Sequence, residues 1–183
     1  EGHVNTLKTR SQERLEKNKD KLNSLIDEGK DTQGKIVGIT DEIEDIKNKL
    51  PDKSQFVTSL KSIEKTENSL ESDLKRLVKD ITFYTSNDTC PSCKQNIDED
   101  FRNSITTDKE AEKLNIEERL VGTEALIKET LDRINQIEDK ENGIVQREKS
   151  IAEKQSLVKS LYEQIQYIKQ EISEIETNQE NIE

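Results

Sequence analysis

Apolar residues recur along both halves of this chain at alternating spacings of three and four. Between Ile36 and Ile81 this spacing gives fourteen positions, of which twelve are apolar, with one exception where two steps of three follow each other, from Val57 to Leu60 to Ile63. Between Ile137 and Ile182 it gives ten apolar positions of fourteen. Such a repeat, kept over several heptads, is typical of α-helices that pair along one narrow seam. We therefore expect an all-α, coiled-coil chain. The expected seam of the first half is Ile36, Ile39, Ile43, Ile46, Leu50, Lys53, Val57, Leu60, Ile63, Glu67, Leu70, Leu74, Leu77 and Ile81. That of the second half is Ile137, Lys140, Ile144, Arg147, Ile151, Lys154, Val158, Leu161, Ile165, Ile168, Ile172, Ile175, Gln179 and Ile182.

The composition excludes a globular domain built around one core. Of the 183 residues, 38% are charged, 29% are hydrophobic and 3% are aromatic, and the chain contains no Trp. A globular chain of this length buries most of its surface, which needs more large apolar side chains than these. High charge with few aromatics is typical of disordered chains or of long paired helices, and the seam favours the helices.

The helical pattern stops in the middle of the chain. Residues 82–85 are rich in β-formers, residues 86–88 are typical of a turn, and Pro91 breaks or kinks any helix that contains it. Asp98 is a good N-cap, and two acidic residues follow it, so a helix is expected to restart there.

The expected organisation is therefore an arm over 1–81, a tip over 82–100 with a short β-like turn, and a second arm over 101–183. Arms of nearly equal length favour a hairpin of two antiparallel helices. The alternative is a parallel dimer of unbroken helices, which Pro91 and the β-rich insert disfavour.

Two irregularities interrupt the first arm. Pro51 is expected to kink the helix rather than end it, because the seam continues in phase to Val57. Gly29, Gly34 and Gly38 each weaken a helix. In a symmetric hairpin, where residue i lies opposite residue 183 − i, these glycines face residues 145–154. We interpret this region as a soft joint, and sequence drift in a spacer explains it equally well.

The tip contains the only two cysteines, Cys90 and Cys93. A Cys-x-x-Cys pair suits redox chemistry, metal binding or no chemistry, and the βαβ pattern typical of the redox proteins is absent. Two thiolates at this spacing are able to share one tetrahedral Zn²⁺, but a structural site needs four ligands. A second copy meeting the first tip to tip supplies the other two, giving one Zn²⁺ per two chains. Lys94 partly offsets the charge of such a four-thiolate site.

Aromatic residues gather around the two cysteines. Half of the six aromatics of the chain lie in a segment of 19 residues, from Phe83 to Phe101. They are expected to form an apolar contact between two tips, or to fill a small core within the turn itself. The expected tip interface is Phe83, Tyr84, Pro91, Ser92, Lys94, Ile97 and Phe101.

The net charge and hydropathy limit the partners. The formal net charge of −11 disfavours direct binding of nucleic acid. No apolar run is long enough for a membrane span, and no signal peptide opens the sequence, so a reducing cell interior is expected. The chain contains no Met, and we expect it to be the middle piece of a longer protein.

A long helix, Thr89-Cys90-Pro91-Ser92-Cys93 at the turn, and a returning helix together resemble the zinc hook of the SMC-like DNA-repair ATPases. That family includes the bacterial SbcC proteins and the large subunits of phage recombination endonucleases. The resemblance covers the whole chain in architecture, but only the C-P-x-C motif is specific. It implies that Cys90 and Cys93 bind a Zn²⁺ that joins two molecules.

The resemblance also implies the setting of the segment. In the parent protein the arms lead to ATPase heads that work with a nuclease on DNA double-strand breaks, in the cytoplasm of a bacterium or of a phage-infected cell. The segment itself contains no phosphate loop, ABC-type motif or nuclease metal cluster, so we expect no catalysis from it. The alternatives are a coiled-coil spacer or scaffold with an incidental Cys pair, and a zinc module that binds nucleic acid.

Overall fold

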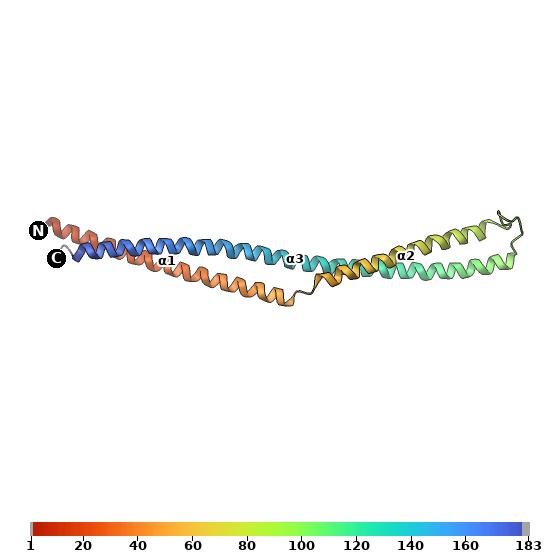
Figure 1. Cartoon of the computed structure of the whole chain (residues 1–183), viewed down its shortest axis with the longest axis horizontal. Helices are drawn as coiled ribbons and strands as arrows, with labels where there is room; N and C mark the ends of the chain where they lie inside the picture. The colour runs from red at the N-terminus through yellow and green to blue at the C-terminus, as the bar shows by residue number, and fades with distance from the viewer. Residues whose placement is uncertain (1, 181–183) are drawn as a thin grey trace. The chain divides into compact units, whose positions relative to one another are not determined.

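The computed structural model describes residues 2–180 and consists of three α-helices (Figure 1). They are α1 (Gly2–Lys49), α2 (Lys53–Ser86) and α3 (Glu99–Glu180). The all-helical architecture is confirmed. Within the described residues, none of the helices is apolar enough over a sufficient length to cross a membrane. The chain divides into two units, one of α1 with α3 from Lys140 onward, and one of α2 with α3 up to Asp139.

In the first unit, α1 pairs antiparallel with the C-terminal part of α3. Two ion pairs show the direction of the pairing, Arg14–Glu171 at 3.1 Å and Lys47–Glu148 at 3.3 Å, because low residue numbers meet high ones. The apolar residues of both helices form a common cluster between them, which comprises Leu15, Leu22, Leu25, Leu161, Ile165, Ile168, Ile172 and Ile175.

In the second unit, α2 pairs antiparallel with the N-terminal part of α3. Lys53 Nζ lies 2.8 Å from Glu138 Oε1, and Lys109 Nζ lies 2.7 Å from Asp80 Oδ2. A smaller apolar cluster joins the two helices, and it comprises Leu70, Leu74, Leu77, Ile116 and Leu120.

The seam predicted from the spacing is the buried face of the helices. All fourteen positions of the first half are buried or half-buried, as are twelve of the thirteen described positions of the second half. The prediction is wrong at Lys140, which is exposed; the neighbouring Glu141 is half-buried and takes its place in the seam. The spacing after Ile137 is therefore four and then three, which keeps Ile144 on the paired face. Ile182 lies outside the described residues.

The seam also extends into the part of α1 that precedes Ile36, where the spacing of apolar residues did not predict it. In α1 it begins at Leu15 and reaches Ile36 with the same spacing, through Asn18, Leu22, Leu25, Gly29 and Thr32. The apolar spacing does not predict this stretch, because two of its buried seam residues, Asn18 and Thr32, are polar. Asn18 Nδ2 donates a hydrogen bond to Glu171 Oε2 across the pair, at 3.3 Å. Thr123, buried in α3, donates instead to the carbonyl of Arg119 in its own helix, at 2.8 Å.

Pro51 ends a helix rather than kinking it, which corrects the expectation. α1 stops at Lys49, where Leu50 N donates to Lys47 O at 3.4 Å, and α2 starts at Lys53. Pro51 has no N–H, and it disfavours the helical conformation of the residue before it. Asp52 then starts the new helix, because its Oδ1 accepts hydrogen bonds from the hydroxyl and the N–H of Ser54, at 2.7 and 2.9 Å. These two bonds lower the pKa of the Asp52 carboxyl.

The prediction that the helix ends before residue 82 is also wrong. α2 continues to Ser86, so the β-formers of residues 82–85 are helical and the non-helical tip is shorter than 82–100. Thr82 and Thr85 donate their hydroxyls to Val78 O and Ile81 O, at 2.7 and 2.8 Å, which satisfies them within the helix. Propensity for β structure depends on context, and here the continuing pairing with α3 outweighs it.

The register differs from that of a symmetric hairpin. The residue numbers of cross-helix pairs add up to 189 for Glu42–Arg147 and to 191 for Lys53–Glu138, rather than to 183. Gly29 consequently shares a groove with Leu161 and Ile165, whereas the symmetric hairpin places Lys154 opposite it. α1 is continuous across the three glycines, and the break in the first arm is at residues 50–52. The soft joint at the glycines stays a prediction.

Substitution of Gly34 by Ala is expected to stabilise the first unit. A Cβ at Gly34 would meet nothing within 4 Å, so the change adds helix propensity without a clash. We expect a gain of about 1 kcal/mol, seen as a rise in the thermal midpoint of about 2–4 °C.

Gly143→Ala is the matched control. A Cβ there would lie 3.3 Å from Arg147 Nη1, which must move, so the gain is expected to be smaller. A lower midpoint for Gly34→Ala would contradict a regular helix at this position.

Candidate metal centre

The apex loop, residues 87–98, joins α2 to α3 and contains both cysteines. Three backbone hydrogen bonds close it: Ile97 N donates to Asp88 O at 2.8 Å, Cys90 N to Gln95 O at 2.8 Å, and Lys94 N to Cys90 O at 2.9 Å. An isolated antiparallel bridge between Thr89 and Asn96 lies between the first two. The loop is therefore a closed turn with the two cysteines at its end.

Asp98 caps the helix that leaves this loop, as predicted. Its Oδ1 accepts a hydrogen bond from Phe101 N at 3.0 Å, and Glu99 and Asp100 lie in the first turn of α3. Carboxylates at this end of a helix satisfy free N–H groups and interact favourably with the helix dipole. The cap fixes where the chain turns back into α3.

The turn that carries the cysteines has an unusual backbone at Lys94, the residue after Cys93. Its φ is 62°, in the left-handed region, which residues other than Gly, Asn and Asp rarely adopt. This conformation directs the chain after Lys94, where Gln95 O accepts the hydrogen bond from Cys90 N. Lys94, Pro91 and Ser92 are exposed.

The two thiols are neighbours, and hydrogen bonds stabilise the thiolate of one of them. Cys90 is half-buried, Cys93 is exposed, and neither forms a disulfide. The pKa of the Cys90 thiol is lowered by the N–H groups of Cys93 and then of Ser92, which donate to its sulfur, and by the Cys93 thiol. The Cys93 sulfur also lies 3.6 Å from Gln95 Oε1. This arrangement favours Cys90 as an anion, the form that binds metals.

The donor set fits half of a structural zinc site. Zn²⁺ accepts thiolate sulfur, and two thiols that touch each other on one turn are suited to hold the same ion. Among the described residues, no group of three or more His, Cys, Asp or Glu side chains is placed to hold a metal. A third or fourth ligand for Cys90 and Cys93 is therefore not provided by the part of the chain described here.

The aromatic residues of the tip form a chain of ring contacts below the cysteines. Phe83 and Tyr84 meet edge to face at 5.2 Å between ring centroids, and Tyr84 meets Phe101 at 6.2 Å. These contacts join the end of α2 to the start of α3, which fits a small core of the turn. Phe101 nevertheless remains 52% exposed, whereas Ile97 is half-buried. Their part in a contact between two tips stays a prediction.

Arg102 is a residue of the site that the sequence analysis missed. It is half-buried in α3, its Nη1 lies 3.5 Å from Asn87 O, and its backbone N donates to Asp98 O at 2.9 Å. The backbone bond is regular for the first turn of a helix, whereas the side chain reaches back to the start of the apex loop. Only its position four residues after the N-cap was visible in the sequence, and that position alone indicates no such role.

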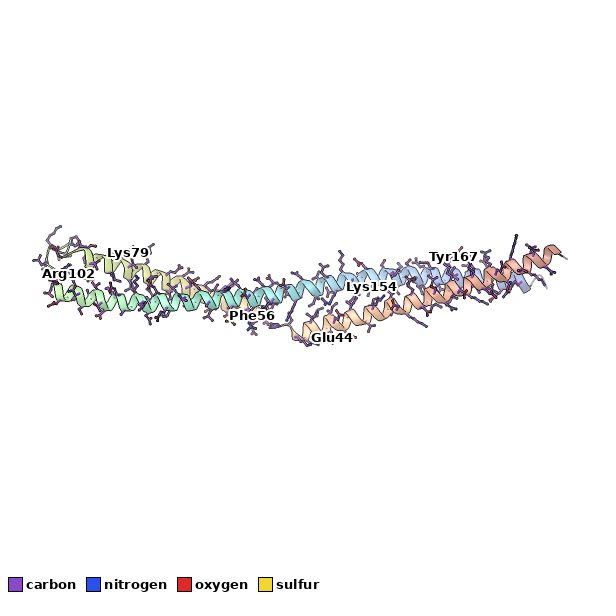
Figure 2. All side chains as sticks on the ribbon, turned by 180° about the vertical axis from the view of Figure 1, so that it is seen from behind. Glu44, Phe56, Lys79, Arg102, Lys154 and Tyr167 are labelled. Carbon is purple, nitrogen blue, oxygen red and sulfur yellow. The ribbon has the colours of Figure 1, made fainter. Side chains whose placement is uncertain are left out.

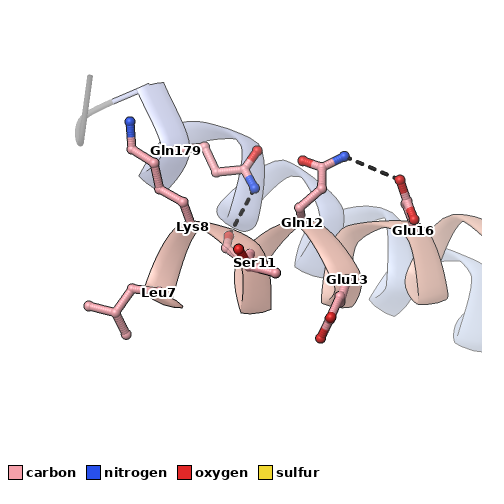
Figure 3. Close-up of a pocket in the computed structure, with 8 residues that line it drawn as sticks. Leu7, Lys8, Ser11, Gln12, Glu13, Glu16 and Gln179 are labelled. Carbon is pink, nitrogen blue, oxygen red and sulfur yellow. Dashed lines mark hydrogen bonds between the residues drawn. The ribbon is translucent and has the colours of Figure 1, made fainter. Parts of the chain in front are cut away.

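A groove of about 450 Å³ lies elsewhere, in the first unit, and contains none of the predicted site residues (Figure 3). Its walls come from the start of α1 and from Gln179, which donates to Ser11 Oγ at 2.9 Å. It includes no cysteine or histidine, and Gln12 donates to Glu16 within the same helix. We assign no chemistry to this groove.

The sequence was also compared with known proteins. No protein-family model matches this chain, and no curated protein matches it.

The lowered pKa of Cys90 predicts its reactivity. In metal-free Cys93→Ser, which retains both backbone N–H donors, alkylation of Cys90 by iodoacetamide is expected to reach half its maximal rate at a lower pH in the folded protein than in concentrated urea. The reason is that a lower pKa produces the reactive thiolate at a lower pH. Rate against pH, measured in both states, checks this, and coincident profiles would contradict the hydrogen bonds to the sulfur.

The left-handed backbone at Lys94 predicts an effect of substitution on Zn²⁺ affinity. Lys94→Asn and Lys94→Val both remove the charge, but only Val strongly disfavours the left-handed conformation. We expect Val to weaken Zn²⁺ binding relative to Asn by about 1–2 kcal/mol, measured by competition with a chromogenic chelator. Equal losses in both variants would instead assign the role of Lys94 to its charge.

Proposed function

We propose that this chain joins a second copy of itself through one Zn²⁺ held by Cys90 and Cys93 of each copy. The observation that carries the proposal is the pair of neighbouring thiols at the end of the apex loop, with a lowered pKa at Cys90 and only two ligands in the described chain. A symmetric dimer brings together two identical pairs and completes the four-thiolate set. Bound Zn²⁺ would supply the link between the tips.

The charge of the apex loop together with the first residues of α3 affects how two tips approach each other. Residues 87–102 include four acidic residues, Asp88, Asp98, Glu99 and Asp100, and two basic ones, Lys94 and Arg102, which gives −2 per tip. Two tips therefore repel each other before the metal binds. This repulsion supports metal coordination, rather than contact between the tips alone, as the source of affinity.

The proposed role of the joint follows from the resemblance to the zinc-hook segment of SMC-like ATPases. In such a protein the segment would tether two molecules whose ATPase heads act with a nuclease in the repair or recombination of DNA double-strand breaks. The segment itself would bind neither DNA nor nucleotide. The paired helices and the C-P-x-C turn between them support this proposal.

A second candidate is a structural spacer or scaffold with incidental cysteines. The extensive pairing of α1 and α2 with α3 favours it, since such pairing needs no metal. The two candidates differ in whether self-association depends on metal.

The test is the mass and zinc content of the chain in solution. We expect a species of twice 21.1 kDa with about one zinc per two chains, which returns to the monomer when a chelator is added. Cys90→Ser is expected to be monomeric with zinc present, because it leaves each tip one thiolate. Multi-angle light scattering and elemental analysis of the eluted protein give both quantities.

Ser104→Ala is the control, because it changes an exposed hydroxyl of α3 outside the expected tip interface and keeps both thiols and both backbone N–H donors. It is expected to dimerise with zinc as the unmodified chain does. A dimer that persists after chelation and in Cys90→Ser would favour the spacer, and a monomer under all conditions would remove the proposed joint.

A further inference from the structure

Arg102 lies near the start of α3, at the end of the chain that carries the apex loop (Figure 2), and its side chain reaches toward the first residue of that loop. Asn87 is the first residue of the loop and Asp98 is the last. Nη1 of Arg102 lies 3.5 Å from the carbonyl oxygen of Asn87, and the backbone N of Arg102 donates to the carbonyl of Asp98 at 2.9 Å. The backbone bond is the first regular hydrogen bond of α3, which any residue at this position makes, so it is the side chain of Arg102 that reaches across the base of the loop.

Asn87 is itself fixed to the end of α2. Its backbone N and its Nδ2 both donate to Phe83 O, at 3.2 and 2.9 Å. The next residue, Asp88, accepts the hydrogen bond from Ile97 N that begins the closed part of the loop. A contact at Asn87 O thus acts directly below the first hydrogen bond of the turn that carries the cysteines.

The stability of the fold alone does not explain an arginine here. Its Nε is buried and has no acceptor among the described residues, and its one side-chain hydrogen bond is long. The chain has 40 acidic and 29 basic residues, yet no described carboxylate forms a salt bridge with Arg102. A buried charged donor without an acceptor costs free energy, and an apolar side chain of similar size avoids this cost.

We infer that Arg102 is a positioning residue, which holds the two ends of the apex loop at a fixed separation and so presets the turn of Cys90 and Cys93. Its importance for metal binding rests on the proposed function, whereas its effect on the loop does not. Lys109 provides the contrast. Its Nζ also joins α3 to α2, through Asp80 at 2.7 Å, but it forms no described hydrogen bond with the loop.

The test compares Arg102→Met with Lys109→Met in the full chain. In the metal-free protein, we expect Arg102→Met to accelerate hydrogen exchange of the Cys90 and Ile97 amides at least about tenfold, because the hydrogen bonds of the loop then open more often. Its thermal midpoint is expected to be unchanged or higher, since an unsatisfied charge is removed. Lys109→Met is expected to leave the exchange of these two amides within about twofold.

The second measurement is zinc affinity. Groups that orient metal ligands from outside the coordination sphere typically contribute about 10- to 100-fold, and we expect Arg102→Met to weaken binding by this amount. Arg102→Lys, which keeps a donor able to reach toward Asn87 O, is expected to recover part of both losses.

Equal loop exchange in Arg102→Met and the unmodified chain would overturn the inference, as would equal acceleration in Lys109→Met. If the unmodified chain binds no zinc, the proposed function fails, while the exchange data still decide the role of Arg102 in the loop. If Arg102→Met does not fold, the same comparison is made with Arg102→Ala, which also removes the side-chain donor, and unchanged exchange there together with unchanged zinc affinity would overturn the inference.

Discussion

The structure depends on one constraint, the burial of a single apolar seam by helices that have few other apolar residues to bury. At a spacing of three and four, a seam residue recurs about once per turn, and the rest of each turn stays charged and solvated. Two clusters result, one in each unit, and between α1 and α3 as between α2 and α3 the contact is narrow. The positions of the helix ends follow from where this contact continues. α2 runs through β-formers to Ser86 because pairing with α3 continues there, and α2 resumes after Pro51 in phase with the seam.

The apex loop is ordered by a different means. It has almost no core of its own, so backbone hydrogen bonds, the Asp98 cap and the ring contacts of Tyr84 determine its shape. A left-handed residue follows the second cysteine, and N–H groups point at the first sulfur. These features cost conformational freedom in a small segment, and stability of the helices does not require them. They are understandable if the turn is shaped to present two sulfurs together, as the proposed zinc joint needs.

The sequence predicted the features that depend on spacing and on single strong residues. The helical class and the Asp98 cap follow from heptad periodicity and from the chemistry of a carboxylate before acidic residues, and both are confirmed. Predictions failed where neighbours in space decide. Lys140 was placed on the seam because the spacing alternates elsewhere, and Thr82–Thr85 were given β character because of composition alone. The contact of Arg102 with Asn87, fifteen residues earlier, produces no periodic pattern in the sequence and could not be predicted from it. The zinc joint is a proposal.

The polar residues within the seam have a consequence for alignment. A purely apolar heptad seam looks the same after a shift of seven residues, so two such helices are able to slide past each other at little cost. Asn18 reduces this degeneracy in the first unit, because its amide meets the carboxylate of Glu171 at one offset, whereas one heptad away in either direction it would meet a neutral amide, Gln164 or Asn178. After a shift of one heptad toward the start of α3, Gln164 would take the place of Glu171, and a neutral amide oxygen would replace the carboxylate as the acceptor, which weakens the hydrogen bond. A polar residue that weakens the seam locally thus favours one register of α1 against α3 among several that bury similar apolar area.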